Sequence, residues 1–475
     1  MRIAVIGAGA VGALIARELC RYEAEVLLFE REPDVGWGVT KANSGIVHAG
    51  FHDEPGTARA RFCAPGNALF PELAAELEIP FRRTGAYVLA FSDKEFSTLE
   101  MLREQGEANG VPGLEIHRRE EVLAREPRVS PEVVAGLWSP TVGITLPWEV
   151  AIAAVENALG NGLELHLDEA VTGVEVSRGK VQAVRTERGR YPVDVVVNAA
   201  GLFADLVSRM AGLDGLELHP RRGEYVLLDE TTGDLVNAVL FPAPTEVSKG
   251  ILVLPTVEGG LLLGPNARDL PPDAREATGT TRDGLSEVIA GAMRLVPDLP
   301  LHKTVKTFAG LRPESSQKDF VLGETKVGGF YQAAAMRSPG LTAAPAIARW
   351  LAREIALAHG LREKGNFNPK RTRIPHPADL PEEEWARLIR EDPRWGRIVC
   401  FCNRVTEGEI VEAICRGART LDGVKFRTRA GFGRCQGGFC TDRVLAILAR
   451  ELGAEPWEVT LRGGDSRIVL GEVRP

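Results

Sequence analysis

The stretch that decides the fold is Arg2-Ile3-Ala4-Val5-Ile6-Gly7-Ala8-Gly9-Ala10-Val11-Gly12, at the start of the chain. The apolar run at 3–6 is typical of a parallel strand that is buried on both faces. The glycines that follow form G-x-G-x-x-G and lead into a helical pattern at 13–19. In such a turn Gly7 allows the tight bend, Gly9 admits a pyrophosphate, and Gly12 lets helix and strand pack closely. The stretch therefore predicts a dinucleotide-binding unit, with the phosphates at the helix N-terminus.

Two further strands support this interpretation. The strand at 25–30 ends in Glu30, at the distance from Gly12 where a ribose-binding acid belongs. The apolar run that begins at Val193 ends in the small residues 198–201, and we expect it to lie beside the first strand. The alternatives are an ordinary glycine-rich turn between strand and helix, and a plain buried strand of an α/β sheet.

Composition excludes several classes of protein. The chain has 475 residues and a net charge of −8, and its sequence contains no basic stripe. Both observations argue against a nucleic-acid-binding protein. No apolar run reaches the length of a membrane span, so we expect no integral membrane segment. The first strand begins at residue 2, which leaves no room for a signal peptide and predicts a cytoplasmic protein.

The order of strand and helix patterns predicts three parts. The fold class is α/β, with a Rossmann-like cofactor domain, a β-rich α+β substrate domain and a small helical C-terminal domain. Prolines and charge runs mark a linker between the second and third parts. The expected boundaries are 1–80, 146–215 and 302–360 for the cofactor domain, 81–145 and 216–301 for the substrate domain, 361–394 for the linker, and 395–475 for the C-terminal domain and tail.

Two loops are candidates for the reacting centre. The loop at 36–50 is rich in small residues, and Thr40, Asn43 and Ser44 can donate to phosphate or ring oxygens. His48 lies at its end, where a structural role and a role at the reacting centre are both open. The stretch 338–342 follows a strand and opens a helix, which predicts a second anion site.

The cysteines are concentrated near the C-terminus. Four of them form C-x-C and C-x4-C, separated by thirty-two residues: Cys400, Cys402, Cys435 and Cys440. In glycine-rich loops this spacing favours a 2Fe–2S cluster, with zinc and then a disulfide as alternatives. Between the pairs, Thr406 and Glu409 predict a capping box at the start of a helix. Cys415 is expected to be a buried helix residue and not a ligand.

Residues 1–355 together resemble the FAD-dependent oxidoreductases of the D-amino-acid-oxidase superfamily, in the branch of glycerol-3-phosphate dehydrogenases and L-2-hydroxyglutarate oxidases. The stretches that carry the resemblance are Gly7–Gly12, Glu30, Asn43–Gly50, Asn198–Gly201, Arg222–Tyr225, Ala309–Pro313 and Ser338–Thr342. The resemblance implies hydride transfer from a small anionic substrate to flavin, with His48 as the candidate base and Arg312 as the cation for the anionic group. The expected FAD-binding residues are Gly7, Gly9, Ala10, Val11, Gly12, Glu30, Arg31, Thr40, Asn43, Ser44, Gly45, Val171, Ala200, Gly201, Gly310, Arg312, Gly340, Leu341 and Thr342.

The C-terminal part resembles the ferredoxin domain of bacterioferritin-associated ferredoxin type, through Cys400–Cys402 and Gly431–Cys440. The resemblance implies a 2Fe–2S cluster held by the four cysteines. Such domains usually carry arginine, glutamate and methionine where this chain has Phe401, Asn403 and Phe432. These changes bear on cluster potential or docking, and no thiolate is lost.

The resemblance leaves several functions open. We expect a dehydrogenase of glycerol 3-phosphate that passes electrons to a second flavoprotein or another acceptor subunit, because an oxidase needs no iron–sulfur outlet. The alternatives are an L-2-hydroxyglutarate dehydrogenase or oxidase, an amine or amino-acid dehydrogenase subunit, and a subunit whose flavin is only an electron relay.

Overall fold

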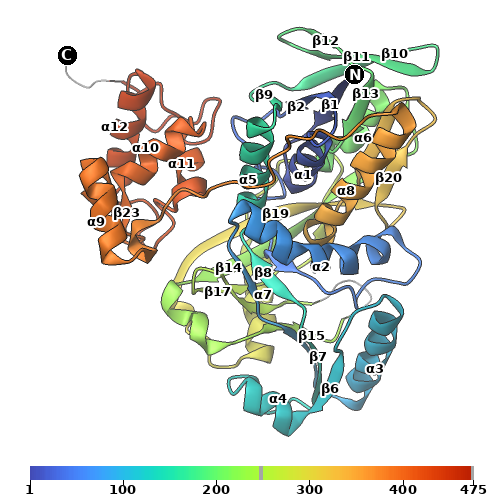
Figure 1. Cartoon of the computed structure of the whole chain (residues 1–475). Helices are drawn as coiled ribbons and strands as arrows, with labels where there is room; N and C mark the ends of the chain where they lie inside the picture. The colour runs from blue at the N-terminus through green and yellow to red at the C-terminus, as the bar shows by residue number, and fades with distance from the viewer. Residues whose placement is uncertain (245–249, 472–475) are drawn as a thin grey trace.

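The computed structural model describes residues 1–244 and 250–471. Residues 245–249 of the predicted substrate domain and 472–475 of the predicted C-terminal domain lie outside the described residues. The chain forms a large two-part body and a smaller helical lobe, joined by an extended segment (Figure 1). No helix in the described ranges has both the length and the apolar character needed to cross a bilayer.

The first part is built on a six-stranded sheet in the order β20-β21-β13-β1-β2-β9. All neighbours are parallel except β20, which runs antiparallel to β21. This confirms the Rossmann-like prediction, and the strand that ends at Asn198 lies directly beside the first strand. The strands are β1 (Arg2–Ile6), β2 (Glu25–Phe29), β9 (Glu164–His166), β13 (Val195–Asn198), β20 (Val321–Glu324) and β21 (Phe330–Ala334).

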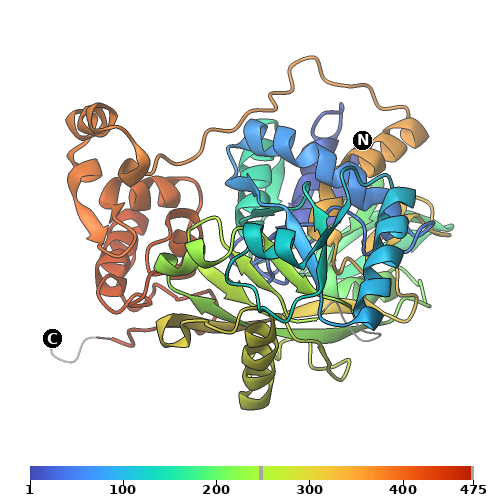
Figure 2. The same cartoon turned by 90° about the horizontal axis from the view of Figure 1, so that it is seen from below.

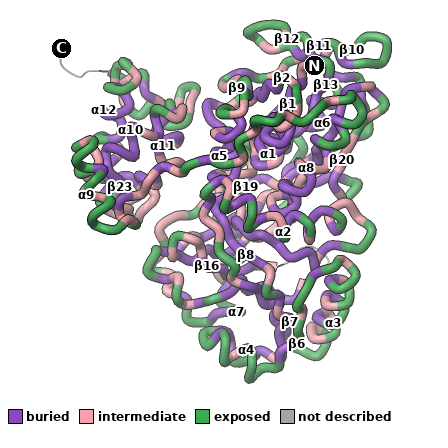
Figure 3. The backbone as a smooth tube through the Cα atoms, viewed as in Figure 1, coloured by how far each residue is buried: buried purple, intermediate pink, exposed green. Residues whose placement is uncertain are grey.

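Helices cover this sheet because its strands are apolar on both faces. The side chains of Ile3, Ala4 and Val5 are fully buried, and buried residues follow the strands and the helices against them (Figure 3). The helices are α1 (Ala10–Leu19), α2 (Ala58–Leu77), α5 (Pro147–Gly160), α6 (Ala204–Met210) and α8 (Gly340–His359), and a small separate sheet consists of β10 (Val171–Ser177), β11 (Lys180–Thr186) and β12 (Arg190–Pro192).

The second part is built on a nine-stranded sheet in the order β18-β14-β17-β16-β15-β5-β7-β6, and β19 lies off this path, paired with β14. Its strands are β5 (Ala86–Ala90), β6 (Glu115–Arg118), β7 (Ala135–Ser139), β14 (Leu218–Leu228), β15 (Val239–Pro242), β16 (Val253–Pro255), β17 (Leu261–Leu263), β18 (Arg268–Asp269) and β19 (Thr304–Ser315). Three helices accompany it, α3 (Asp93–Ala108), α4 (Arg119–Arg125) and α7 (Arg282–Leu295), and a small sheet of β3 (Ile46–Val47), β4 (Phe81–Arg83) and β8 (Gly143–Thr145) connects the two parts.

One predicted boundary is corrected by this topology. The segment 302–360 was expected to belong to the cofactor domain, but β19 pairs with β14 from Leu218 to Leu228. The physical reason is that β19 is long, and its backbone hydrogen bonds are satisfied by an antiparallel partner in the substrate sheet. The substrate domain therefore includes residues 304–315, and the chain returns to the cofactor sheet only at β20.

The C-terminal lobe is helical (Figure 2). It has a hydrophobic core separate from those of the larger body. The predicted capping box is present, because Thr406 N donates to Glu409 Oε2 at 2.7 Å and Glu409 N donates to Thr406 Oγ1 at 3.3 Å. Cys415 is exposed, which corrects the expectation of burial, since it is the last residue of its helix and lies outside the lobe's core. The elements are α9 (Glu382–Glu391), β22 (Ile398–Cys400), β23 (Val405–Thr406), α10 (Glu407–Cys415), α11 (Leu421–Thr428) and α12 (Thr441–Leu452).

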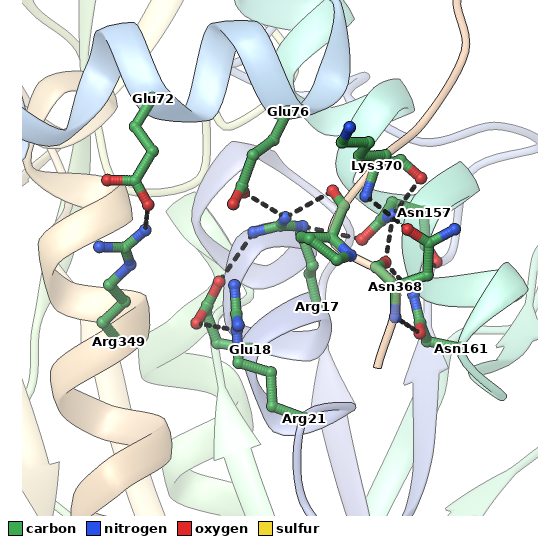
Figure 4. Close-up of polar contacts among 11 residues, drawn as sticks. Arg17, Glu18, Arg21, Glu72, Glu76, Asn157, Asn161, Arg349, Asn368 and Lys370 are labelled. Atoms are coloured by element: carbon green, nitrogen blue, oxygen red, sulfur yellow. Dashed lines mark hydrogen bonds and ion pairs between the residues drawn. The ribbon is translucent and has the colours of Figure 1, made fainter. Parts of the chain in front are cut away.

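The predicted linker is only partly a linker. Its first half lies against the cofactor domain, where Asn157 Nδ2 donates to the carbonyl oxygens of Asn368 and Lys370, both at 3.0 Å (Figure 4). Arg371 is buried and pairs with Glu149 at 3.0 Å and Glu156 at 2.7 Å. The second half forms α9, which packs beside the C-terminal helices. The lobe is thus tethered by a segment that is fixed to the larger body.

Candidate functional site

The predicted dinucleotide turn joins β1 to α1, and its glycines pack directly against backbone carbonyl groups. Gly7 has a φ of +100°, and a Cβ there would lie 2.6 Å from the carbonyl oxygen of Ala199. A Cβ at Gly12 would lie 1.9 Å from the carbonyl oxygen of Gly7. Gly9 is the N-cap of α1 and provides no side-chain cap. The first turn of α1 thus offers amides beside a tight glycine turn, which fits a bound pyrophosphate.

Glu30 follows β2, and the backbone fixes its carboxylate. Its oxygens accept from the amides of Ala8 at 2.8 Å and of Glu32 at 3.0 Å. Burial raises the pKa of Glu30, and the two amides act in the opposite direction without cancelling the rise. This is the position from which an acid reaches a ribose hydroxyl. Arg31 pairs with Glu32 at 3.0 Å and lies 3.9 Å from the ring centroid of Phe203.

The polar side chains of the loop 36–50 bond within the fold. Thr40 Oγ1 accepts from the amide of Ala10 at 3.0 Å. Asn43 Nδ2 donates to the carbonyl oxygen of Thr40 at 2.9 Å, and its Oδ1 accepts from the amide of Gly45 at 2.8 Å. Thr40 and Asn43 therefore hold the loop, including Ser44, against the start of α1.

The remaining predicted cofactor residues lie on separate elements of the cofactor and substrate domains. Where β19 passes the loop, a Cβ at Gly310 would lie 1.9 Å from the carbonyl oxygen of Ala42, so only glycine fits there. The others are placed as follows: Val11 in the first turn of α1, Val171 at the start of β10, Ala200 and Gly201 directly after β13, and Gly340, Leu341 and Thr342 in the first turn of α8.

His48 is held between two predicted motifs. Its amide donates to Thr342 Oγ1 at 2.8 Å, and its Nε2 lies 3.2 Å from Ser338 Oγ. Its carbonyl oxygen accepts from Asn67 Nδ2 at 2.9 Å. The imidazole is 6.0 Å from the ring of Phe241, centroid to centroid. The fold thus brings the loop 36–50 to the N-terminus of α8. The Ser338 contact could not be foreseen, because 290 residues separate it from His48.

Arg312 lies on β19, opposite Arg221 of β14. Its Nη2 donates to the carbonyl oxygen of Asn266 at 2.6 Å, and burial lowers its pKa. Glu314, two residues along the same strand, lies 3.3 Å from Arg221 Nη1 and 3.3 Å from Arg337 Nε. No carboxylate in the described ranges forms an ion pair with Arg312. Its guanidinium is held by the backbone carbonyls of Arg221, Arg222 and Asn266.

The four predicted cluster ligands all lie in the C-terminal lobe. Cys402 Sγ lies 3.6 Å from Cys435 Sγ. Burial, and next the neighbouring Cys400, raise the pKa of Cys440 to about 12. A Cβ at Gly433 would lie 2.3 Å from Cys402 Cβ, so the loop closes only with glycine there.

The thiols form two pairs, 402 with 435 and 400 with 440, and four thiolates are what a 2Fe–2S cluster requires. Burial would raise the pKa of Cys435, but backbone amides, those of Phe439 and Gly437 among them, leave it lowered, which suits a thiolate ligand. Within the described ranges, no group of three or more His, Cys, Asp or Glu side chains is placed so that it could hold one metal ion.

A dinucleotide turn, a histidine beside a second helix N-terminus, and a cysteine loop in a separate lobe define a flavin- and iron–sulfur-containing oxidoreductase. Residues 2–354 match the family described as FAD dependent oxidoreductase, and the chain belongs to that family. Residues 398–450 match the BFD-like [2Fe-2S] binding domain. Its cofactors are FAD and a 2Fe–2S cluster.

Three relatives illustrate the range of the similarity. The chain is 46% identical to a glycerol 3-phosphate dehydrogenase of Caloramator mitchellensis, over 99% of this chain and 98% of the relative. It is 27% identical to the mitochondrial L-2-hydroxyglutarate dehydrogenase of Mus musculus, over 74% and 87% of the two chains. The FAD-bound L-α-glycerophosphate oxidase of Mycoplasma pneumoniae superposes with a TM-score of 0.73 at 29% identity, covering 78% of this chain and 98% of that one.

Proposed function

We propose that this enzyme oxidises glycerol 3-phosphate at its secondary hydroxyl and delivers the electrons through its 2Fe–2S cluster to a protein acceptor. The observation that carries the proposal is Arg312, a half-buried guanidinium with no carboxylate partner in the described ranges. The similarity to the Caloramator mitchellensis dehydrogenase, which extends over both the flavin part and the cluster part, supports the same substrate.

Arg312 binds the phosphate group in this mechanism. A guanidinium offers two parallel donors to a phosphate or carboxylate, and the pair is stronger where water is excluded. Glu314 pairs with Arg221 and Arg337, and Asp269 also pairs with Arg221, so both neighbouring cations have carboxylate partners. Arg312, which forms no ion pair with a carboxylate in the described ranges, fixes one end of the substrate.

His48 takes the hydroxyl proton at Nε2. That nitrogen lies 3.2 Å from the hydroxyl oxygen of Ser338, and the neutral tautomer with its proton on Nδ1 leaves Nε2 as an acceptor, which is the state a general base requires. Thr342 and Asn67 hold the backbone on both sides of the imidazole. When bound, FAD supplies the acceptor for the hydride that leaves the substrate carbon.

The cluster lobe favours a dehydrogenase over an oxidase. A cluster held by Cys400, Cys402, Cys435 and Cys440 carries electrons singly, and an enzyme that reduces oxygen directly has no use for such an exit. We infer that the acceptor is a second flavoprotein or another electron-acceptor subunit. L-2-hydroxyglutarate is the second candidate substrate, favoured by the stretch Asn43–Gly50 and by the similarity to the mouse enzyme.

The test is a substrate titration of the Arg312→Lys variant and the parent under anaerobic conditions. Flavin bleaching by glycerol 3-phosphate should require a far higher concentration in the variant, with flavin content unchanged. Lysine retains the charge but loses the two-pronged geometry. Equal substrate affinity in the two proteins would remove Arg312 from its assigned role.

A further inference from the structure

The cluster lobe is docked on the flavin domain through a buried ion pair. Arg427 of α11 binds the carboxylate of Asp34 through both terminal nitrogens, with Nη2 at 2.8 Å from Oδ1. The two side chains are only 6% and 3% exposed. A buried pair with this geometry fixes one orientation of two surfaces, because any shift leaves a charge unpaired.

An aromatic stack lies in the same interface. The ring of Trp148, at the start of α5, stacks on the ring of Phe432 with centroids 5.7 Å apart and planes 18° apart. Phe426 approaches both rings edge-on, at 5.4 Å from Trp148 and 5.5 Å from Phe432. Arg429 covers the stack, 3.6 Å from the Phe432 centroid, and its guanidinium binds Glu258 of the substrate domain.

The Phe432 end of the stack belongs to the cluster loop. Phe432 lies three residues before Cys435, and its carbonyl oxygen accepts from Gln436 Nε2 at 2.9 Å. The carbonyl oxygen of Arg429 accepts from Asn403 Nδ2 at 2.9 Å, directly beside Cys402. The residues next to Cys402 and Cys435 are therefore hydrogen-bonded to Arg429 and Phe432.

The Trp148 end lies against the loop 36–50, which the sequence predicts to border the cofactor. A Cβ at Gly36 would lie 3.6 Å from the Cα of Trp148, so the loop 36–50 passes directly against this residue. The amide of Gly36 donates to the carbonyl oxygen of Ala8, in the dinucleotide turn, at 2.9 Å. A continuous packed route thus joins the flavin-binding turn to the cluster loop.

We propose that the Trp148–Phe432 stack, covered by Arg429, is the junction through which electrons pass from the flavin to the cluster within one chain. This rests on the proposed function. The substrate delivers two electrons and a proton to FAD; each electron then crosses singly and reduces one ferric ion of the cluster to the ferrous state. The proton leaves to water, and a one-electron acceptor reoxidises the cluster between the two transfers. Trp148 and Phe432 are positioning residues in this step.

The test compares Phe432→Leu with Phe426→Leu, which removes an aromatic ring of the same interface but not of the stack. Stopped-flow absorbance follows flavin reduction by glycerol 3-phosphate, and freeze-quench electron paramagnetic resonance follows the reduced cluster. Phe432→Leu should leave flavin reduction unchanged and slow cluster reduction by roughly tenfold to a hundredfold, the range in which an ångström-scale misplacement is felt. Phe426→Leu keeps the Trp148–Phe432 pair and removes only the ring that contacts it edge-on, so it should slow cluster reduction much less than Phe432→Leu does.

Trp148→Phe keeps a stacked ring and should retain most of the rate of cluster reduction, whereas Trp148→Leu should lose most of it. Photoreduction of the flavin with a sacrificial amine donor starts the same transfer without substrate, so failure of the substrate assignment is seen separately. Equal cluster reduction in Phe432→Leu and the parent, by either route, would overturn the junction. So would equal slowing in the Phe426 and Phe432 variants, because that would indicate loss of docking alone.

Discussion

Replacing Asp34 by alanine tests how firmly the cluster lobe is held. In the parent, the Asp34 carboxylate and the Arg427 guanidinium form a bidentate pair with side chains 3% and 6% exposed. Removing one partner leaves the other charge buried, which costs about 3–5 kcal/mol. Because the tether at 368–371 remains attached, we expect most of this cost to appear as undocking of the lobe.

A penalty of about 4 kcal/mol changes the docking equilibrium by roughly a thousandfold, since about 1.4 kcal/mol corresponds to tenfold. Calorimetry should then show a separate, earlier transition for the lobe, and trypsin should cut the segment before α9 faster. The double variant Asp34→Leu, Arg427→Met replaces the pair by apolar groups and should recover much of the loss.

The matched control is Glu391→Ala, which breaks the exposed pair Arg387–Glu391 of the same lobe, with side chains 60% and 57% exposed. A helical surface pair contributes about 0.3–0.5 kcal/mol, so this variant should behave like the parent. If Asp34→Ala shifted the transition no more than Glu391→Ala does, the buried pair would not be what docks the lobe.

Further predictions concern the two redox sites and the substrate domain. His48→Gln should slow flavin reduction by about 10²–10⁴ at neutral pH, measured by stopped flow, while flavin content stays constant. Gly433→Ala should lower the iron content of the purified protein, because the added Cβ falls 2.3 Å from Cys402 Cβ, and should leave flavin bleaching intact. Burial raises the pKa of Glu126 from its ordinary value of about 4.5 to about 7. The folded chain therefore keeps a proton that the unfolded chain has lost, and stability should fall as pH rises from about 4.5 to about 7. Glu126→Gln should flatten that slope in pH-dependent urea unfolding.

Each of these has a contrary result. Normal flavin reduction in His48→Gln would exclude the imidazole as the base. Full iron content in Gly433→Ala would show that the loop accepts a side chain at that point. An unchanged pH slope in Glu126→Gln would assign the titration to another group.

The dinucleotide turn and the cluster loop were predictable because their constraints are local. The close approach of Gly12 to the carbonyl oxygen of Gly7 follows from their spacing alone. The same holds for the helix start at Thr406 and Glu409, whose two bonds lie within four residues. These features depend on backbone geometry that the adjacent sequence encodes.

The missed features depend on distant partners. The stretch around Gly310 borders the flavin loop, so its assignment to the cofactor domain was natural, but its strand partner lies about ninety residues earlier. The prolines near Pro369 suggested a free linker, whereas Arg371 is anchored by two glutamates of α5. The Asp34–Arg427 pair joins residues 393 apart, and no periodicity reveals it.

The most direct test of the central claim is an anaerobic titration of the purified protein with glycerol 3-phosphate, with L-2-hydroxyglutarate as the parallel sample, while flavin absorbance is recorded. The account predicts prompt bleaching by glycerol 3-phosphate alone. Bleaching only by the hydroxy acid would contradict it and make L-2-hydroxyglutarate the substrate. No bleaching by either would contradict it too, and would direct the search to amines or to a relay subunit.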